Sequence, residues 1–251
     1  MRLFSLHGRR AFITGANTGI GQGIAVALAE AGADIIAAGR SSMAETMNAV
    51  RGHDRHCEEV LADFADKNAA VSAFETAWQR FGPVDILVNN AGIIRRADAV
   101  DFMEKDWDDV MDLNLKSVFF LCQALARKAL GAGRSARIIN IASVLSVQGG
   151  VRVPSYTASK SGMAGLTREL ACEWAVKGIN VNAIAPGYIE TNNTEALRED
   201  PVRRSQIVDR IPAGRWGLPQ DIGGAAAFLA SDAAAYVHGI LLPVDGGWLA
   251  R

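Results

Sequence analysis

The 251 residues of this chain include 26 basic and 27 acidic side chains, which give a formal net charge of -1. A chain so close to neutrality lacks the basic field that holds a polyanion, so we exclude nucleic acid as its main partner. Hydrophobic residues make up 49% and charged residues 21%, proportions that are typical of a packed globular protein and exclude a disordered or fibrous one. The three cysteines (Cys57, Cys122 and Cys172) have no CxxC spacing. We therefore expect neither a disulfide framework nor a metal site.

No linker rich in Pro, Gly or Ser divides the chain, which predicts a single domain over residues 1–251. The first apolar stretch is too short for a signal peptide, and no later stretch has the length that a membrane-spanning helix needs. We therefore expect a cytoplasmic protein without a membrane partner.

Short β-branched runs alternate with longer amphipathic stretches along the chain, a pattern that indicates βαβ units. The expected strands cover residues 10–14, 34–38, 57–61, 86–88, 137–141, 180–184 and 240–244. The expected helices cover residues 21–31, 68–81, 105–130, 155–177 and 219–230. These elements predict an α/β fold, a single Rossmann-type doubly wound domain with a seven-stranded parallel sheet flanked by helices. Residues 186–217 are polar and show no clear period, which predicts an irregular lid or binding loop.

Three glycines follow the first expected strand, where the chain must turn sharply into a helix. Glycine tolerates positive φ and lets a pyrophosphate approach the free amides of the helix N-terminus. The three glycines predict a dinucleotide site. A tight turn that binds no ligand, however, would have the same glycine pattern. The candidate residues of the site are Gly15, Asn17, Thr18, Gly19, Ile20 and Gly21.

Two side chains after the next strands bear on which coenzyme binds. Arg40 follows the second expected strand, where dinucleotide folds place an acid for NAD or an arginine for the 2'-phosphate of NADP. Arg40 therefore favours NADP, with a solvated arginine at a strand end as the alternative. Asp63 follows the third strand and either accepts a hydrogen bond from adenine or caps a turn. The fourth strand ends in Asn89, Asn90, Ala91 and Gly92, small residues that allow a coenzyme to lie against the backbone.

Three side chains that can donate or accept protons lie further along the chain. Ser143 follows the fifth strand, and Tyr156 and Lys160 are one helical turn apart on a single face. A free phenol has a pKa of about 10, and an adjacent ammonium and an oxidised nicotinamide both favour phenolate. We predict Tyr156 as the acid/base and Ser143 as a donor to the carbonyl oxygen. Lys160 would hold the nicotinamide ribose, and Asn114 a water molecule that links Lys160 to solvent.

Together these motifs resemble the short-chain dehydrogenase/reductase family over essentially the whole chain. The resemblance extends to Pro186, Gly187 and Thr191, and it implies that Ile189 and Thr191 contact the carboxamide and phosphate side of the coenzyme. Members of the family are commonly tetramers, so a homotetramer is expected.

Longer runs, including NNAGIIRRADAV, SVQGGVRVPSYTASKSG and NVNAIAPGYIETNNT, resemble a narrower group, the 2-dehydro-3-deoxy-D-gluconate 5-dehydrogenases (also described as 2-deoxy-D-gluconate 3-dehydrogenases) of uronate catabolism. The resemblance implies a six-carbon deoxy sugar acid as substrate, and it favours NAD where Arg40 favours NADP. A carboxylate substrate needs cationic or multidentate partners. Our candidates are Arg95, Gln148, Arg152 and Tyr188, with Arg96 nearby. Surface or subunit-interface roles remain the alternative for each arginine.

Three other functions remain open at this point. A related activity reduces the 4-deoxy-5-hexoseulose uronate derived from alginate. A 3-oxoacyl-carrier-protein reductase would need a basic docking surface, which the near-neutral charge does not favour. A nucleotide-sensing protein without catalysis would have no need of a serine, tyrosine and lysine set.

Overall fold

The computed structural model describes residues 2–251 and contains a seven-stranded sheet with the strand order β3-β2-β1-β4-β5-β6-β7. Every neighbouring pair of strands is parallel. The strands are β1 Arg10–Thr14, β2 Asp34–Gly39, β3 Cys57–Leu61, β4 Ile86–Asn89, β5 Ala136–Ile141, β6 Ile179–Pro186 and β7 Leu241–Val244. The predicted fold class and all seven predicted strands are confirmed, with ends that differ by at most two residues.

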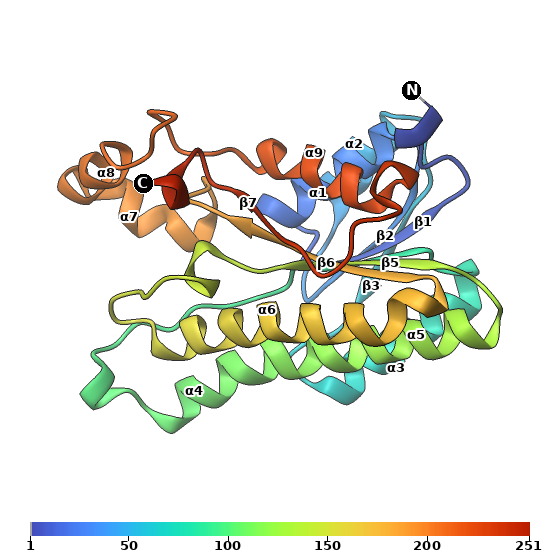
Figure 1. The fold of residues 1–251 in the computed structure, drawn as a ribbon, viewed down its shortest axis with the longest axis horizontal. Helices are drawn as coiled ribbons and strands as arrows, with labels where there is room; N and C mark the ends of the chain where they lie inside the picture. Colours follow the sequence, from blue (N-terminus) through green and yellow to red (C-terminus); the bar gives the residue numbers. More distant parts are fainter. Residues whose placement is uncertain (1) are drawn as a thin grey trace.

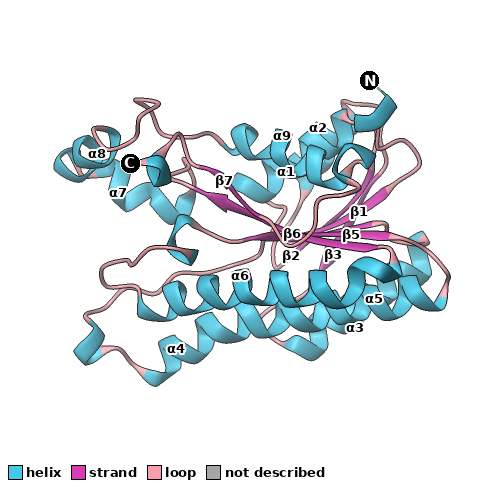
Figure 2. Ribbon diagram, viewed as in Figure 1, coloured by secondary structure: helices cyan, strands magenta, loops and turns pink. Residues whose placement is uncertain are grey.

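Helices cover both faces of the sheet (Figures 1 and 2). One face carries α1 Gly19–Glu30, α2 Ala44–Arg51 and α9 Pro219–Ala230. The other carries α3 Lys67–Phe81, α4 Glu104–Met111, α5 Ser117–Gly131 and α6 Pro154–Trp174. Two short helices, α7 Glu195–Glu199 and α8 Pro201–Val208, lie with the C-terminus at one end of the molecule (Figure 1).

Alternating side chains of each central strand supply the two cores that hold these layers together. In β1, Phe12 packs edge-on against Phe74 of α3 with ring centroids 5.3 Å apart, whereas Ile13 belongs to the cluster that contains Ile24 of α1. Parallel strands that are buried on both faces are expected to be apolar almost throughout. The sheet is therefore rigid, and the loops at the carboxyl ends of its strands are held in fixed positions.

The strand order reverses between β1 and β4, and ligands of open α/β sheets bind at such a point. A hydrogen-bond network joins the two strand ends there. The hydroxyl Oγ1 of Thr14 accepts from the backbone N–H groups of both Asn90 and Ala91, each at 3.0 Å. The crevice at this reversal is thus fixed by backbone contacts as well as by the sheet itself.

Three features differ from the sequence prediction. The helix expected over residues 105–130 is interrupted by a π-helical segment, Asp112–Lys116, between α4 and α5. Helix α2 was not predicted, because its eight residues are polar on average and bury only Thr46 and Val50. Residues 186–217, predicted to be irregular, contain α7 and α8. Asp200 caps α8 by accepting from the N–H groups of Val202 and Arg203, and this local signal outweighs the missing apolar period.

Within residues 2–251, no helix has both the length and the apolar character needed to cross a bilayer. The same residues contain no group of three or more His, Cys, Asp or Glu side chains placed to hold a metal ion.

Candidate active site

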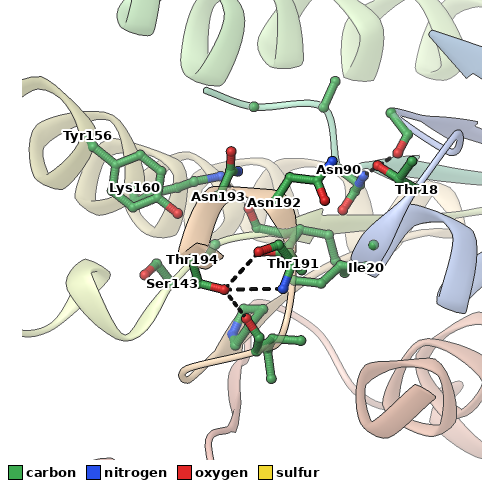
Figure 3. Close-up of a pocket in the computed structure, with 18 of the residues that line it drawn as sticks. Thr18, Ile20, Asn90, Ser143, Tyr156, Lys160, Thr191, Asn192, Asn193 and Thr194 are labelled. Atoms are coloured by element: carbon green, nitrogen blue, oxygen red, sulfur yellow. Dashed lines mark hydrogen bonds between the residues drawn. The ribbon is translucent and has the colours of Figure 1, made fainter. Parts of the chain in front are cut away.

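A cavity of about 310 Å³ opens at the point where the strand order reverses (Figure 3). Figure 3 shows Tyr156 and Lys160 at one end of this cavity and Thr18 and Asn90 at the other. Most of the predicted coenzyme residues line it, namely Gly15, Asn17, Thr18, Gly19, Ile20, Ala91, Gly92, Tyr156, Lys160, Pro186, Gly187, Ile189 and Thr191. We call it the coenzyme cavity.

The glycine turn has no room for side chains. A Cβ atom on Gly21 would lie 2.1 Å from the carbonyl oxygen of Gly15, and one on Gly15 would lie 2.9 Å from Nδ2 of Asn90. Gly15 and Gly19 also have positive φ angles of 65° and 56°, a region that favours glycine. Gly21 is buried and shapes the turn from beneath, and it does not line the cavity.

The turn leads directly into the N-terminus of α1. Its N-cap residue, Thr18, makes no side-chain capping bond, so the first amides of α1 keep their hydrogen-bonding capacity for another acceptor. A bare backbone cradle at a helix N-terminus fits the pyrophosphate of a dinucleotide. The residues present therefore fit a nicotinamide coenzyme, with Gly15 to Ile20 around its phosphates.

The segment after β4 supports the glycine turn through Asn90, a contact that the sequence did not predict. Asn90 donates from Nδ2 to the carbonyl oxygens of Thr14 at 2.9 Å and Gly15 at 3.0 Å, so it holds the glycine turn from below. Asn89, a predicted coenzyme ligand, instead turns into the sheet, where Nδ2 donates to Oδ1 of Asn140 at 2.9 Å. That bond joins the neighbouring strands β4 and β5, and the Asn89 side chain does not line the cavity.

Two predicted coenzyme residues lie beyond the cavity wall. Asp63 is exposed and accepts from the N–H of Ala65 at 3.0 Å, which matches the turn-capping alternative. Arg40 is exposed and forms no ion pair within the described residues. Its neighbour Ser41 accepts a hydrogen bond from Nδ2 of Asn17 at 3.1 Å. Because Asn17 lines the cavity, Arg40 lies one residue from a side chain that contacts the cavity wall, and no hydrogen bond of the Arg40 side chain occurs within the described residues.

Three side chains with proton-handling chemistry meet at the other end of the cavity. Lys160 is buried, and its Nζ donates to the carbonyl oxygen of Ile141 while lying 5.6 Å from the centroid of the Tyr156 ring. Ser143 follows β5 and lines the same cavity, with Oγ accepting from the N–H of Leu145 at 3.1 Å. The spacing of Tyr156 and Lys160 on α6 thus brings a phenol and an ammonium together, beside the hydroxyl of Ser143.

The electrostatics of this group differ from the sequence expectation. Burial raises the pKa of Tyr156 above its usual range, and the Ser143 hydroxyl and the Arg96 guanidinium only oppose that rise. Burial also lowers the pKa of Lys160 to about 8. The protein alone therefore keeps Tyr156 as a neutral phenol, which is the form that can donate a proton. Lys160 is not among the causes of this shift, so the lowering of the Tyr156 pKa that we expected from its ammonium is not present in the protein alone.

Asn114 reaches this region because of the π-helical segment, a local distortion that is frequent at functional sites. The residue is fully buried, and its amide both accepts from the N–H of Ile93 and donates to the C=O of Ile93, each at 2.9 Å. A further contact of 3.4 Å joins Nδ2 to Oγ of Ser159 on α6. Asn114 therefore ties the segment after β4 to the helix that carries Tyr156.

The comparisons with known proteins agree with this geometry. A family model described as Enoyl-(Acyl carrier protein) reductase matches residues 15–249. The 2-dehydro-3-deoxy-D-gluconate 5-dehydrogenase of Dickeya dadantii is 58% identical over 100% of this chain and 99% of its own length. The chain belongs to the short-chain dehydrogenase/reductase family. It is therefore an NAD(P)-dependent dehydrogenase that acts on a CH–OH group.

Two solved members of the family superpose closely on this chain. A crystal structure from Agrobacterium tumefaciens with bound NADP has a TM-score of 0.95 and 61% identity, and the match covers 100% of both chains. A gluconate 5-dehydrogenase from Burkholderia cenocepacia in complex with NADP and tartrate has a TM-score of 0.94 and 40% identity, over 100% of this chain and 98% of that one.

A second cavity of about 410 Å³ adjoins the first, and we call it the substrate cavity. Ser143, Tyr156, Gly187, Asn193 and Thr194 line both cavities, so the two meet at the predicted acid/base. In this short-chain dehydrogenase/reductase, the side chain predicted as the acid/base thus has one cavity on each side.

Only two of the four predicted substrate residues reach the substrate cavity. Gln148 and Tyr188 line it, whereas Arg95 and Arg152 do not. Arg95 pairs with Asp106 and Asp109, each at 3.4 Å, and Arg152 pairs with Asp98 at 3.1 Å. Neighbouring carboxylates have therefore drawn both guanidinium groups away from the cavity. Arg96, which adjoins the candidate Arg95, lines it instead, together with Arg203 and Arg210 of the predicted lid segment.

Proposed function

We propose that this protein catalyses hydride transfer between NADP(H) and a six-carbon deoxy sugar acid, as a 2-dehydro-3-deoxy-D-gluconate 5-dehydrogenase. One observation carries the proposal: Ser143 and Tyr156 lie in the shared wall of a coenzyme cavity and a substrate cavity. The full-length relative that bears this enzyme name supports the choice of substrate. The arginines of the substrate cavity support an acidic one.

In this function each side chain has a definite task. The bound coenzyme supplies or accepts the hydride. Tyr156 donates its phenolic proton to the carbonyl oxygen in the direction of reduction and takes it back in oxidation. Ser143 donates a hydrogen bond to the same oxygen as negative charge develops there. Lys160 binds the nicotinamide ribose and favours the phenolate, and Asn114 keeps α6 and the segment after β4 in register.

We also propose that residues 186–217 act as a lid over both cavities. Gly217 donates from its N–H to the carbonyl oxygen of Tyr188 at 2.9 Å and accepts from the N–H of Glu190 at 2.9 Å. These bonds join the two ends of the segment, and α7 and α8 lie between them. Thr191, Asn193 and Thr194 at its start line the coenzyme cavity, so movement of the lid would reach the coenzyme.

A panel of substrates tests the function. Purified protein should be assayed with 2-dehydro-3-deoxy-D-gluconate, the alginate-derived 4-deoxy-5-hexoseulose uronate, 3-oxoacyl thioesters and neutral ketones, each with both coenzymes. Selective turnover of the sugar acids supports the proposal, and the better of the two sugar acids decides between the related activities. Equal turnover of neutral ketones, or preference for thioesters, would contradict it.

Coenzyme choice is expected to depend on Arg40. Because no hydrogen bond of its side chain occurs within the described residues, the Arg40→Ser variant should lose a charge-assisted bond to the 2'-phosphate. We expect kcat/KM for NADPH to fall by about 10- to 100-fold and kcat/KM for NADH to change little. Arg51→Ser is the matched control, since Arg51 is also exposed but ends α2 away from the cavity. An unchanged NADPH preference in Arg40→Ser would show that the 2'-phosphate is bound elsewhere.

A further inference from the structure

The charged side chains that line the substrate cavity are all positive. Its lining includes the guanidinium groups of Arg96, Arg203 and Arg210, and no Asp or Glu of the described residues lines it. Arginine is well suited to bind a carboxylate in a partly dry cleft, because its planar fork of N–H donors matches the two oxygens. The three arginines differ in which other groups they already contact.

Arg210, just after α8, has an apolar support and no carboxylate partner. Its guanidinium carbon lies 4.0 Å from the centroid of the Trp248 ring. No ion pair of Arg210 occurs within the part of the chain that the structure describes. The adjacent Asp209 lines a different cavity and contacts Ser205 at 3.3 Å. Stacking thus holds the guanidinium plane while its N–H groups stay free for an anion.

Arg203 lies two helical turns earlier and lines the same cavity. Its Nη1 donates to Oε1 of Gln206 at 3.1 Å, a neutral partner that leaves its charge uncompensated. Burial raises the pKa of the Tyr188 phenol, and the charges of Arg203 and Arg210 both oppose that rise. Arg203, Arg210 and Tyr188 all line the substrate cavity, so the two uncompensated charges belong to the same cavity wall.

The C-terminal turn fixes this arrangement. Nε1 of Trp248 donates to Oε1 of Gln148 at 3.1 Å, and the Trp248 ring lies 4.7 Å from that of Tyr188. Arg251 donates from Nη1 to the carbonyl oxygen of Asp209 at 3.2 Å, which ties the chain end to the end of α8. Figure 1 shows the C-terminus beside α7 and α8. Trp248 thus supports Arg210 from a segment outside the lid.

Arg96 is placed for a different contact. Its Nη2 donates to the carbonyl oxygen of Asn193 at 3.1 Å, and its charge acts on the Tyr156 phenol. In a six-carbon acid with its carbonyl at C5, the carboxylate at C1 is four C–C bonds away, about 5 Å. A substrate whose C5 oxygen contacts Tyr156 therefore extends its carboxylate away from the phenol and from Arg96.

We propose that Arg203 and Arg210 bind the carboxylate of the substrate, and that Trp248 is the positioning residue that holds Arg210 for this contact. This assignment rests on the proposed function and adds to it which residues select an acid. It also gives the lid a direct role, because α8 carries Arg203 and leads into Arg210.

The test compares Arg210→Gln and Arg203→Gln with wild type and with Arg204→Gln, a control on α8 whose side chain lines the cavity on the other side of the lid. Each protein is assayed for the oxidation of 2-dehydro-3-deoxy-D-gluconate and of its counterpart that has a primary alcohol in place of the carboxylate. Tartrate is then tested as an inhibitor of the neutral reaction. We expect each of the two variants to raise KM for the acid by about 10- to 100-fold relative to KM for the neutral substrate, and to lose tartrate inhibition.

The role of Trp248 is tested by a measurement that a general loss of packing would not change, the selectivity for the acid over the neutral substrate. Trp248→Phe keeps an aromatic face under Arg210 and should retain most of the selectivity for the acid over the neutral substrate, whereas Trp248→Leu should lose that selectivity. Equal losses for acid and neutral substrates in the Arg210 and Arg203 variants would overturn the proposal, as would intact tartrate inhibition. If wild type reduces neutral ketones but no sugar acid, the proposed function fails, and arginine-dependent tartrate inhibition still supports the carboxylate site.

Discussion

Tyr156→Phe is expected to lower kcat by about 10²- to 10⁴-fold while the affinity for NADPH stays close to that of wild type. The variant removes only the hydroxyl group, and the ring can keep its place near Nζ of Lys160, which lies 5.6 Å from its centroid. Proton transfer to the carbonyl oxygen would then have to come from water. Stopped-flow turnover and a fluorescence titration with NADPH measure the two quantities separately.

The pH dependence of the wild type gives the control for this prediction. Because burial raises the pKa of Tyr156, the phenol is protonated at neutral pH and can donate its proton. Carbonyl reduction should therefore be constant around neutrality and should fall when the pH rises through the phenol's pKa. The residual rate of Tyr156→Phe should lack that alkaline fall. Turnover within a factor of two of wild type would show that another group handles the proton.

Gly21→Ala is expected to have the second large effect, on coenzyme affinity. The added Cβ would lie 2.1 Å from the carbonyl oxygen of Gly15, and because that atom belongs to the backbone, the turn itself must shift. Strain of this kind costs about 1–3 kcal/mol. We expect the Kd for NADPH to rise by about 10- to 100-fold and the melting temperature to fall, as measured by fluorescence titration and circular dichroism.

Gly224→Ala provides the matched control, because Gly224 lies in α9 and a Cβ there would meet no atom within 4 Å. Alanine has the higher helix propensity, so this variant should bind NADPH normally and melt at the same or a higher temperature. Normal NADPH affinity in Gly21→Ala would contradict the assignment of the glycine turn to the coenzyme phosphates.

The sequence predicted those parts of the fold that depend on local pattern. Central strands such as β1, β2 and β4 could be located because buried parallel strands are short apolar runs. The Tyr156–Lys160 pair could be placed because spacing on a helix determines which residues share a face. Helix α2 has little apolar surface, so its sequence pattern did not predict a helix. The π-helical segment around Asn114 depends on contacts with Ile93 and Ser159, which are distant in sequence.

The substrate cavity was the least predictable part, because arginines compete for carboxylates in three dimensions. Arg95 and Arg152 follow the motif segments closely in sequence, yet Asp106, Asp109 and Asp98 bind them elsewhere. Arg210 faces the cavity because Trp248, 38 residues later, provides a surface for its guanidinium group. The position of Asn90, rather than Asn89, beneath the glycine turn likewise depends on which strand lies next to β4.

The most direct measurement is the oxidation of 2-dehydro-3-deoxy-D-gluconate by the purified protein with NADP⁺, followed by the absorbance of the reduced coenzyme and by ¹³C NMR of the product. We predict one equivalent of reduced coenzyme for each new carbonyl, and a carbonyl resonance at C5. No reduction of the coenzyme with this acid, or a carbonyl at another carbon, would contradict the account.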